Sequence, residues 1–99
     1  MNFGEKLKQI RMQKNLTQPQ MAEAIGIEQS YLSKLENDKS IPSADMFQAI
    51  IQSLDMDSKE FLKDIDRKIL QTSLKQIPEV AAYLNAEISV RTHNAKKWL

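Results

Sequence analysis

The chain has 99 residues, a length that suffices for one compact domain with its own core but not for two independent ones. It is 41% hydrophobic and 27% charged, with 2 glycines and 3 prolines, which excludes a disordered or fibrous chain and favours helix. The absence of cysteine excludes disulfides and thiolate metal sites, and a net charge of +1 provides no overall basic field for a nucleic acid.

The first apolar stripe, at three- and four-residue spacing, predicts a helix from about residue 3 to residue 14. Thr17 then offers a hydroxyl N-cap and Pro19 stands in the first turn of a short second helix, predicted over residues 18–25. Gly26 follows directly, at the place where helices commonly stop in the left-handed conformation that glycine adopts cheaply. The sequence therefore predicts two helices and a tight turn at Gly26.

A third helix is predicted over residues 28–37, and its two faces differ in chemistry. Tyr31, Leu32 and Leu35 fall on one side at 100° per residue. The opposite side carries amides, hydroxyls and one cation, on Gln29, Ser30, Ser33, Lys34 and Asn37. A plain solvated face would carry paired Glu and Lys at four-residue spacing, so this polar face is a candidate recognition surface. Two helices joined by a short glycine-containing turn match the DNA-binding helix-turn-helix.

Two further short helices follow, the first capped by Ser43 and the second capped by Asp57 or Ser58. Five short helices within residues 1–65, joined by short connections, predict a small all-α bundle.

Beyond residue 65 a heptad-like stripe appears, with alternating four- and three-residue spacings. Its members, which are candidates for dimerisation, are Leu70, Leu74, Ile77, Ala81, Leu84 and Ile88. Pro78 disfavours helix at the residue before it, so we expect a break at Ile77 and a helix from Pro78 to about Asn94. We divide the chain into a DNA-binding domain, residues 1–65, and a helical association element, residues 66–99. The stripe can pair two copies or pack back onto the fifth helix, and we favour pairing.

The outer face of the third helix has side chains suited to a B-DNA major groove, which is ~12 Å wide and admits one helix. Glutamine can bond the adenine edge, lysine can donate to guanine, and serine can act toward either kind of partner. We expect base contacts from Gln29, Ser30, Ser33 and Lys34. Thr17 and Gln18, at the positive N-terminus of the second helix, are placed to contact a phosphate.

A specific combination of residue types and spacings extends over nearly thirty positions, at Leu16-Thr17-Gln18, Met21-Ala22, Gly26-Ile27, Ser30-Tyr31-Leu32-Ser33, Leu35-Glu36-Asn37, Lys39 and Ile41-Pro42. In these residues the chain closely resembles the phage-repressor (Cro/CI, or Xre) helix-turn-helix family. The resemblance implies an all-α, five-helix lambda-repressor-like domain, followed here by one or two C-terminal helices. It also implies a transcriptional repressor that reads a palindromic operator in double-stranded DNA as a homodimer.

The resemblance also implies roles for individual residues. Gln18 would anchor the second helix on the phosphate backbone, and Asn37, Lys39 and Ser43 would hold the next phosphates. Arg11 would pair with Glu36 and fix the third helix to the first. As an exposed pair these two side chains would contribute at most about 1 kcal/mol.

Two departures from the family pattern concern acidic residues. The family often has glycine after the recognition helix, whereas this chain has Asn37 and Asp38, which brings a carboxylate near the phosphates. Glu28 begins the third helix, where it can stabilise the helix N-terminus or accept from a cytosine amine, and we favour the first role.

The main alternative is an antitoxin-like module whose C-terminal helices, within residues 66–99, bind a partner protein. We expect no enzyme activity and no cofactor, because the sequence offers no acid/base pair, nucleophile elbow, phosphate loop or metal cluster. His93 is the sole histidine and has no second ligand nearby, so no metal site is expected.

No apolar run approaches the ~20 residues that span a bilayer, and no signal peptide precedes the first helical pattern. We therefore expect a cytoplasmic protein with no membrane segment in this chain. The basic run that ends in Trp98 and Leu99 is also typical of a cytoplasmic flank leading into a membrane helix, which would make the chain part of a longer, membrane-anchored regulator. We favour an ordinary helix end.

Overall fold

A computed structural model of the chain describes residues 1–86. Its helices are α1 (Phe3–Gln13), α2 (Gln18–Ile25), α3 (Gln29–Glu36), α4 (Ala44–Ser53), α5 (Ser58–Leu62) and α6 (Arg67–Thr72). Residues 78–86 are helical as well, and there is no strand within residues 1–86. The expected all-α class is therefore confirmed.

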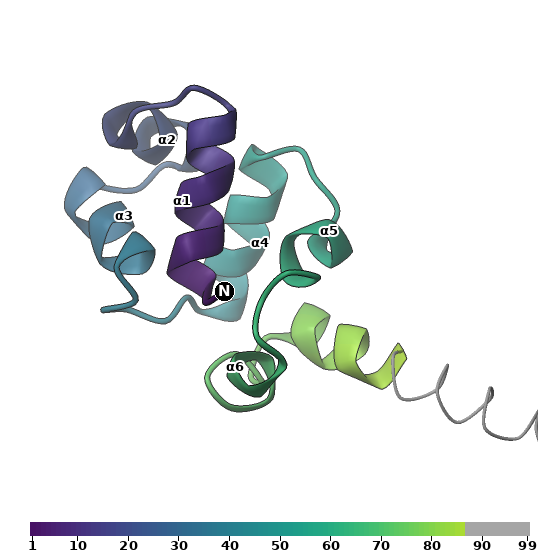
Figure 1. The fold of residues 1–99 in the computed structure, drawn as a ribbon. Coiled ribbons are helices and arrows are strands. Elements are labelled where there is room, and N and C mark those ends of the chain that lie inside the picture. The colour runs from purple at the N-terminus through teal and green to yellow at the C-terminus, as the bar shows by residue number, and fades with distance from the viewer. Residues whose placement is uncertain (87–99) are drawn as a thin grey trace, which may run out of the picture.

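Helix α1 occupies the centre of the bundle, with α2 and α3 on one side of it and α5 on the other (Figure 1). Three phenylalanines from α1, α4 and α5 meet at its inner face. The ring centroid of Phe3 lies 6.4 Å from that of Phe47 and 5.3 Å from that of Phe61. All three side chains are buried, so aromatic packing joins the first helix to the last helices of the predicted domain.

Polar side chains begin most helices by accepting hydrogen bonds from backbone amides. Thr17 caps α2 in a reciprocal capping box with Gln20, and Ser43 caps α4 through the amide of Met46. Asp57 caps α5. The expected N-caps Thr17 and Ser43 are therefore present, and of the two candidates for α5 the aspartate fills the position.

The turn after α2 lies where the sequence predicts it. Gly26 adopts a left-handed conformation, with φ of +86°, directly after α2. Helix α3 is one residue shorter at each end than the expected 28–37, because Glu28 is its N-cap and Asn37 its C-cap. The left-handed exit after α3 is made by Asp38, with φ of +58°.

Gly4 marks a close approach between helices that sequence analysis missed. A Cβ atom at this position would lie 2.4 Å from the carbonyl oxygen of Glu36 and 2.6 Å from that of Leu35. Only a residue without a side chain lets the start of α1 lie against the end of α3.

The C-terminal stripe faces the core of its own chain. Leu70, Leu74 and Ile77 are buried in the same hydrophobic cluster as the phenylalanines, together with Val80. Their burial corresponds to the packing-back arrangement and leaves these three side chains unavailable to a partner.

The remaining stripe residues differ from these in exposure. Ala81 is exposed and Leu84 half-buried, while Ile88 lies outside the described residues. The first C-terminal helix also ends earlier than expected, at Thr72 instead of near Ile77, whereas the next helix begins at Pro78 as predicted.

Polar contacts join the start of the chain to the segment between α5 and α6, which lies next to the predicted division after residue 65. The ammonium of Lys6 in α1 lies 2.7 Å from a carboxylate oxygen of Asp64. The carbonyl of Met1 accepts from the amide of Asp66 at 2.8 Å. The start of the chain is thus fixed to the connection between α5 and α6.

None of the helices in residues 1–86 combines the length and apolar character that a membrane span requires.

Candidate nucleic-acid interface

Helix α3 is held from behind by its apolar side. Leu32 and Leu35 are fully buried, and Tyr31 is half-buried against the same core. The helix packs on α1 and α2. Its apolar residues thus fix it in place and direct the opposite side outward.

Three of the four predicted base-contacting residues are exposed on that opposite side, namely Gln29, Ser30 and Lys34. Ser33 is half-buried, and its carbonyl accepts a 2.9 Å hydrogen bond from the side-chain amide of Asn37. The amide nitrogen of Asn37 also lies 3.4 Å from the Ser33 hydroxyl. The exposed polar surface is therefore centred on Gln29, Ser30 and Lys34, with Ser33 at its edge.

Arg11 and Glu36 form the expected pair, but the pair is buried. The Arg11 Nε donates to Glu36 Oε2 at 2.7 Å, and Arg11 Nη2 donates to the other carboxylate oxygen at 3.1 Å. Only 12% of the Arg11 side chain and 2% of the Glu36 side chain are exposed. A further hydrogen bond of 2.8 Å from Arg11 Nη1 to the Leu16 carbonyl completes the guanidinium's contacts.

The bound of about 1 kcal/mol holds for two solvent-exposed charges, so it does not apply to this pair, whose side chains are largely buried. Removing one partner of a buried pair leaves the other charge without compensation in a poorly hydrated site. The bidentate geometry also fixes the relative orientation of α1 and α3.

The Glu36 carboxylate extends this pair toward the polar face. Gln18 Nε2 donates to Glu36 Oε1 at 3.2 Å, and Gln18 Oε1 accepts from Gln29 Nε2 at 3.5 Å. A row of side chains thus runs from buried Arg11 to exposed Gln29. Sequence reasoning assigned Gln18 to a phosphate and missed this bridge, because residues 18 and 29 meet only once the turn at Gly26 is formed.

The predicted phosphate-contacting residues lie on two segments next to α3. One is the start of α2, and the other is the connection between α3 and α4. Thr17 and Ser43 are exposed at the N-termini of α2 and α4, where their hydroxyl oxygens accept capping bonds. Asn37 and Lys39 are exposed on the segment that follows α3. Helix N-termini and a lysine are groups that commonly hold phosphates.

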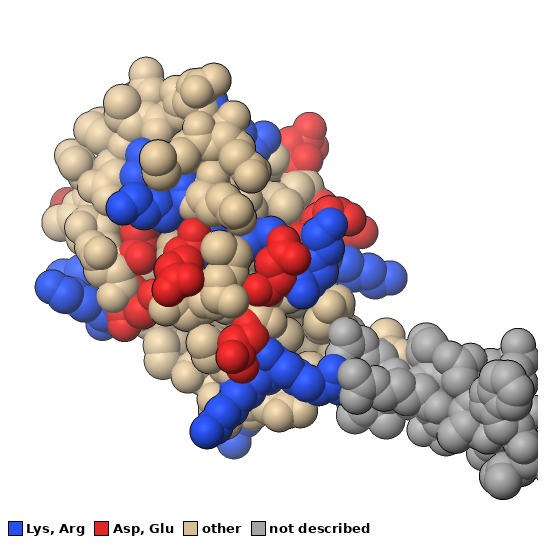
Figure 2. All heavy atoms as spheres, in the orientation of Figure 1, with Lys and Arg blue, Asp and Glu red and all other residues tan. Residues whose placement is uncertain are grey.

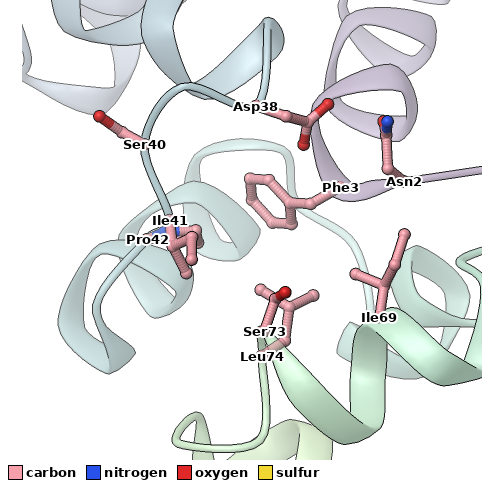
Figure 3. Close-up of a pocket in the computed structure, with 9 residues that line it drawn as sticks. All are labelled: Asn2, Phe3, Asp38, Ser40, Ile41, Pro42, Ile69, Ser73 and Leu74. Carbon is pink, nitrogen blue, oxygen red and sulfur yellow. The ribbon is translucent and has the colours of Figure 1, made fainter.

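The sequence suggested that the Asp38 carboxylate lies near the DNA phosphates, but in the structure it points toward the start of α1. Its carboxylate accepts a 2.9 Å hydrogen bond from the backbone amide of Gly4, at the start of α1. Figure 3 shows the side chain reaching from the loop toward Asn2 and Phe3, whereas Ser40 points away from them. Asp38 thus stabilises the N-terminus of α1 and serves the fold.

A pocket of about 250 Å³ lies behind this loop, between the start of α1 and α6 (Figure 3). It is lined by Asn2, Phe3, Asp38, Ser40, Ile41, Pro42, Ile69, Ser73 and Leu74. Sequence analysis did not foresee it, because its walls come from three segments that are distant in sequence.

Charges on the molecular surface are mixed. On the face shown in Figure 2, acidic and basic side chains alternate without a wide area of one sign. Glu28 is exposed at the start of α3 and its side chain makes no capping hydrogen bond. Any contribution of this carboxylate to the helix is therefore through its charge alone.

Comparison with known proteins identifies a helix-turn-helix domain, in agreement with the arrangement of α2, the Gly26 turn and α3. Residues 4–67 match the helix-turn-helix domain family. The chain is 37% identical over 62 residues to the HTH-type transcriptional activator BcrR of Enterococcus faecalis, covering 63% of this chain and 30% of that protein. It is also 37% identical over 54 residues to the immunity repressor protein of Bacillus phage phi105, covering 54% of this chain and 38% of the repressor.

The matched region of this chain thus corresponds to about a third of each of these two curated relatives. The family match includes α1 to α5, the Gly26 turn and the polar face of α3. This protein belongs to the helix-turn-helix family of phage-repressor type.

Proposed function

We propose that the chain is a sequence-specific DNA-binding transcription regulator that acts as a repressor. It inserts α3 into the major groove of a palindromic operator and binds as a homodimer. The observation that supports this proposal most is the exposed polar face of α3, held at a fixed angle by the buried Arg11–Glu36 pair. One of the two relatives is named an immunity repressor and the other a transcriptional activator, so the comparisons support transcription regulation, and repression is proposed from the family resemblance.

In this proposal Gln29, Ser30, Ser33 and Lys34 contact base edges. Thr17, Gln18, Asn37, Lys39 and Ser43 contact phosphates on either side of the groove. The 14 lysine and arginine residues are balanced by 13 aspartate and glutamate residues, so the net charge is only +1. Specific contacts, and not a general basic field, therefore provide most of the affinity.

The test uses an operator obtained by selection from random duplex DNA. Gln29→Ala and Lys34→Ala should each weaken binding to that operator by about 1 to 3 kcal/mol, because each change removes a base contact. Fluorescence anisotropy titrations at a fixed salt concentration measure the loss.

Matched controls come from outside the proposed interface. Gln71 and Lys75 are equally exposed, beyond the helix-turn-helix, so Gln71→Ala and Lys75→Ala should bind as the unmodified chain does. If Gln29→Ala and Lys34→Ala also bind unchanged, α3 does not read the operator.

A further inference from the structure

The pocket behind the loop between α3 and α4 is lined by residues to which the proposed function assigns no contact with DNA. Its volume is about 250 Å³, and it lies between the start of α1, residues 38–42 and α6 (Figure 3). An apolar cavity of about 150 Å³ is large enough to hold benzene. The pocket therefore has room for one six-membered ring that carries a short chain.

Much of the pocket wall is apolar. Phe3, Pro42 and Leu74 are buried residues of this wall, and Ile69 is half-buried. Ile41 lines the pocket as well, and it is 56% exposed. A ring in the pocket would remove apolar surface of Ile41 from water and would pack on a Phe3 side chain that the core already holds in place.

The polar part of the wall carries a carboxylate but no cation. Of the described residues that line the pocket, Asp38 is acidic and none is basic. One oxygen of Asp38 accepts the 2.9 Å hydrogen bond from the Gly4 amide, and within residues 1–86 the carboxylate forms no ion pair. A carboxylate has about four acceptor positions, so Asp38 can accept from a further donor.

The positions of these groups define the ligand by its chemistry. In Figure 3 the Asp38 side chain reaches toward the Phe3 ring, and Ser73 and Leu74 lie on the opposite side of that ring. An anionic ligand would meet the charge of Asp38 without a cation in the wall to offset it. An ammonium group has three donors and no acceptor, so it is complementary to this carboxylate.

We propose that this pocket is an effector site for a small primary amine that carries one ring. The ring packs against Phe3, Ile41 and Leu74, and the ammonium donates to Asp38. The inference deepens the proposed function, because Asp38 directly precedes Lys39, a proposed phosphate contact. Binding of the amine does not rest on the proposed function, whereas its effect on DNA affinity does.

An occupied pocket strengthens DNA binding. The negative charge of Asp38 opposes the approach of phosphates to the segment that carries Lys39, and a bound ammonium offsets this charge. Across about 10 Å, which is also the Debye length at 0.1 M salt, one charge in water changes an affinity by about twofold. The expected effect is therefore a rise of about twofold in operator affinity.

The first experiment uses phenethylamine as the probe. In an NMR titration of the full chain, it should cause saturable shifts at the backbone amides of Ser40, Ile41 and Leu74, with a dissociation constant of about 1 mM. Phenethyl alcohol has nearly the same shape but no charge, and it should bind about fivefold more weakly, the largest effect typical of one exposed ion pair. Phenylacetate carries the opposite charge and should cause no saturable shift.

Asp38→Asn is the matched variant, because asparagine keeps an acceptor for the Gly4 amide and tolerates the left-handed backbone of this position. It should lower the affinity for phenethylamine about fivefold and leave the affinity for phenethyl alcohol unchanged. Loss of the fold would instead abolish binding of both probes.

A second pair of variants tests the location. Ser73→Phe should prevent binding of both probes, because the new ring fills the pocket. Gln71→Phe is its control, since Gln71 is exposed on α6 and does not line the pocket. It should bind both probes as the unmodified chain does.

The DNA arm measures operator affinity by fluorescence anisotropy at matched ionic strength. Saturating phenethylamine should raise the affinity of the unmodified chain about twofold and leave that of Asp38→Asn unchanged. Amine binding without this rise overturns the effector role.

Three results of the NMR titrations overturn the site itself. Phenethylamine causes no saturable shift, or the three probes bind equally, or Asp38→Asn binds phenethylamine as the unmodified chain does. These titrations contain no DNA, so they are independent of the proposed function. Absence of operator binding in the amine-free protein counts against the proposed function instead.

Discussion

At the scale of single residues, the position of the recognition helix depends on side chains that are not exposed to DNA. The Arg11–Glu36 pair was predictable as a pair from the family resemblance, because both residue types stand at the expected positions. Its burial was not predictable, because exposure depends on how α1, α2 and α3 pack around it. The same holds for the bridge from Glu36 through Gln18 to Gln29.

Replacing Glu36 should therefore be costly. Glu36→Ala leaves the Arg11 guanidinium, only 12% exposed, without its carboxylate, and we expect a loss of about 3 to 5 kcal/mol in the free energy of unfolding. This is a large part of the ~5 to 15 kcal/mol typical of a domain. Urea unfolding measures it, with Glu60→Ala, which removes an exposed carboxylate, as a control that should change little. Equal stability of the two variants would contradict burial of the pair.

Gly4 gives a second prediction at this scale. Gly4→Ala should destabilise the protein by about 1 to 3 kcal/mol, although alanine is the better helix former, because the new methyl meets two backbone carbonyls of α3 that cannot move freely. Thermal melting measures the change. A variant that melts at or above the temperature of the unmodified chain would show that α1 and α3 do not approach as closely as described.

At the scale of elements, periodicity and turn chemistry predicted the first four helices well. The stripes of α1 and α2, the cap at Thr17 and the glycine at position 26 are all local features. The end of α6 was mispredicted, because Leu74 and Ile77 continue the apolar spacing although they stand in a turn. Apolar spacing identifies residues that need burial, but it does not show whether the burying partner is the same chain.

The connection between α1 and the segment after α5 predicts a pH dependence. A hydrogen bond from Lys6 holds the pKa of the Asp64 carboxyl below its ordinary value. Because the pKa is lower in the folded state, the pair stabilises the protein above the unfolded-state pKa of about 3.9 and this contribution is lost as the pH falls through the folded-state value.

The comparison of unfolding midpoints between the unmodified chain and Asp64→Asn tests this dependence. The difference should be present at neutral pH and should close in acid, where both chains carry a neutral side chain at this position. Asp55→Asn, at an exposed turn residue, is the control and should show little difference at neutral pH. A difference between Asp64→Asn and the unmodified chain that is independent of pH would indicate that ionisation of Asp64 plays no part.

At the scale of the whole molecule, the net charge is only +1 and the proposed DNA contacts come from a few defined side chains. The salt dependence of DNA affinity should therefore report the number of phosphates that these side chains neutralise. The logarithm of affinity should fall against the logarithm of salt concentration with a slope of about −0.9 for each phosphate neutralised. Lys39→Ala should reduce the slope by about one, because it removes one cation from the proposed phosphate contacts. Lys75→Ala should leave the slope unchanged, and a similar change in both variants would argue against a specific phosphate contact by Lys39.

The central claim, that α3 reads DNA as part of a two-fold pair, is tested most directly by selecting binding sites from random duplex DNA with the unmodified chain. We predict enrichment of a palindrome whose half-sites are centred about 34 Å apart, one helical turn of DNA or a multiple of it. The same selection with Gln29→Ala should change the enriched bases in each half-site while keeping their spacing. Failure to enrich any sequence, or an unchanged preference in the Gln29→Ala variant, would contradict the account.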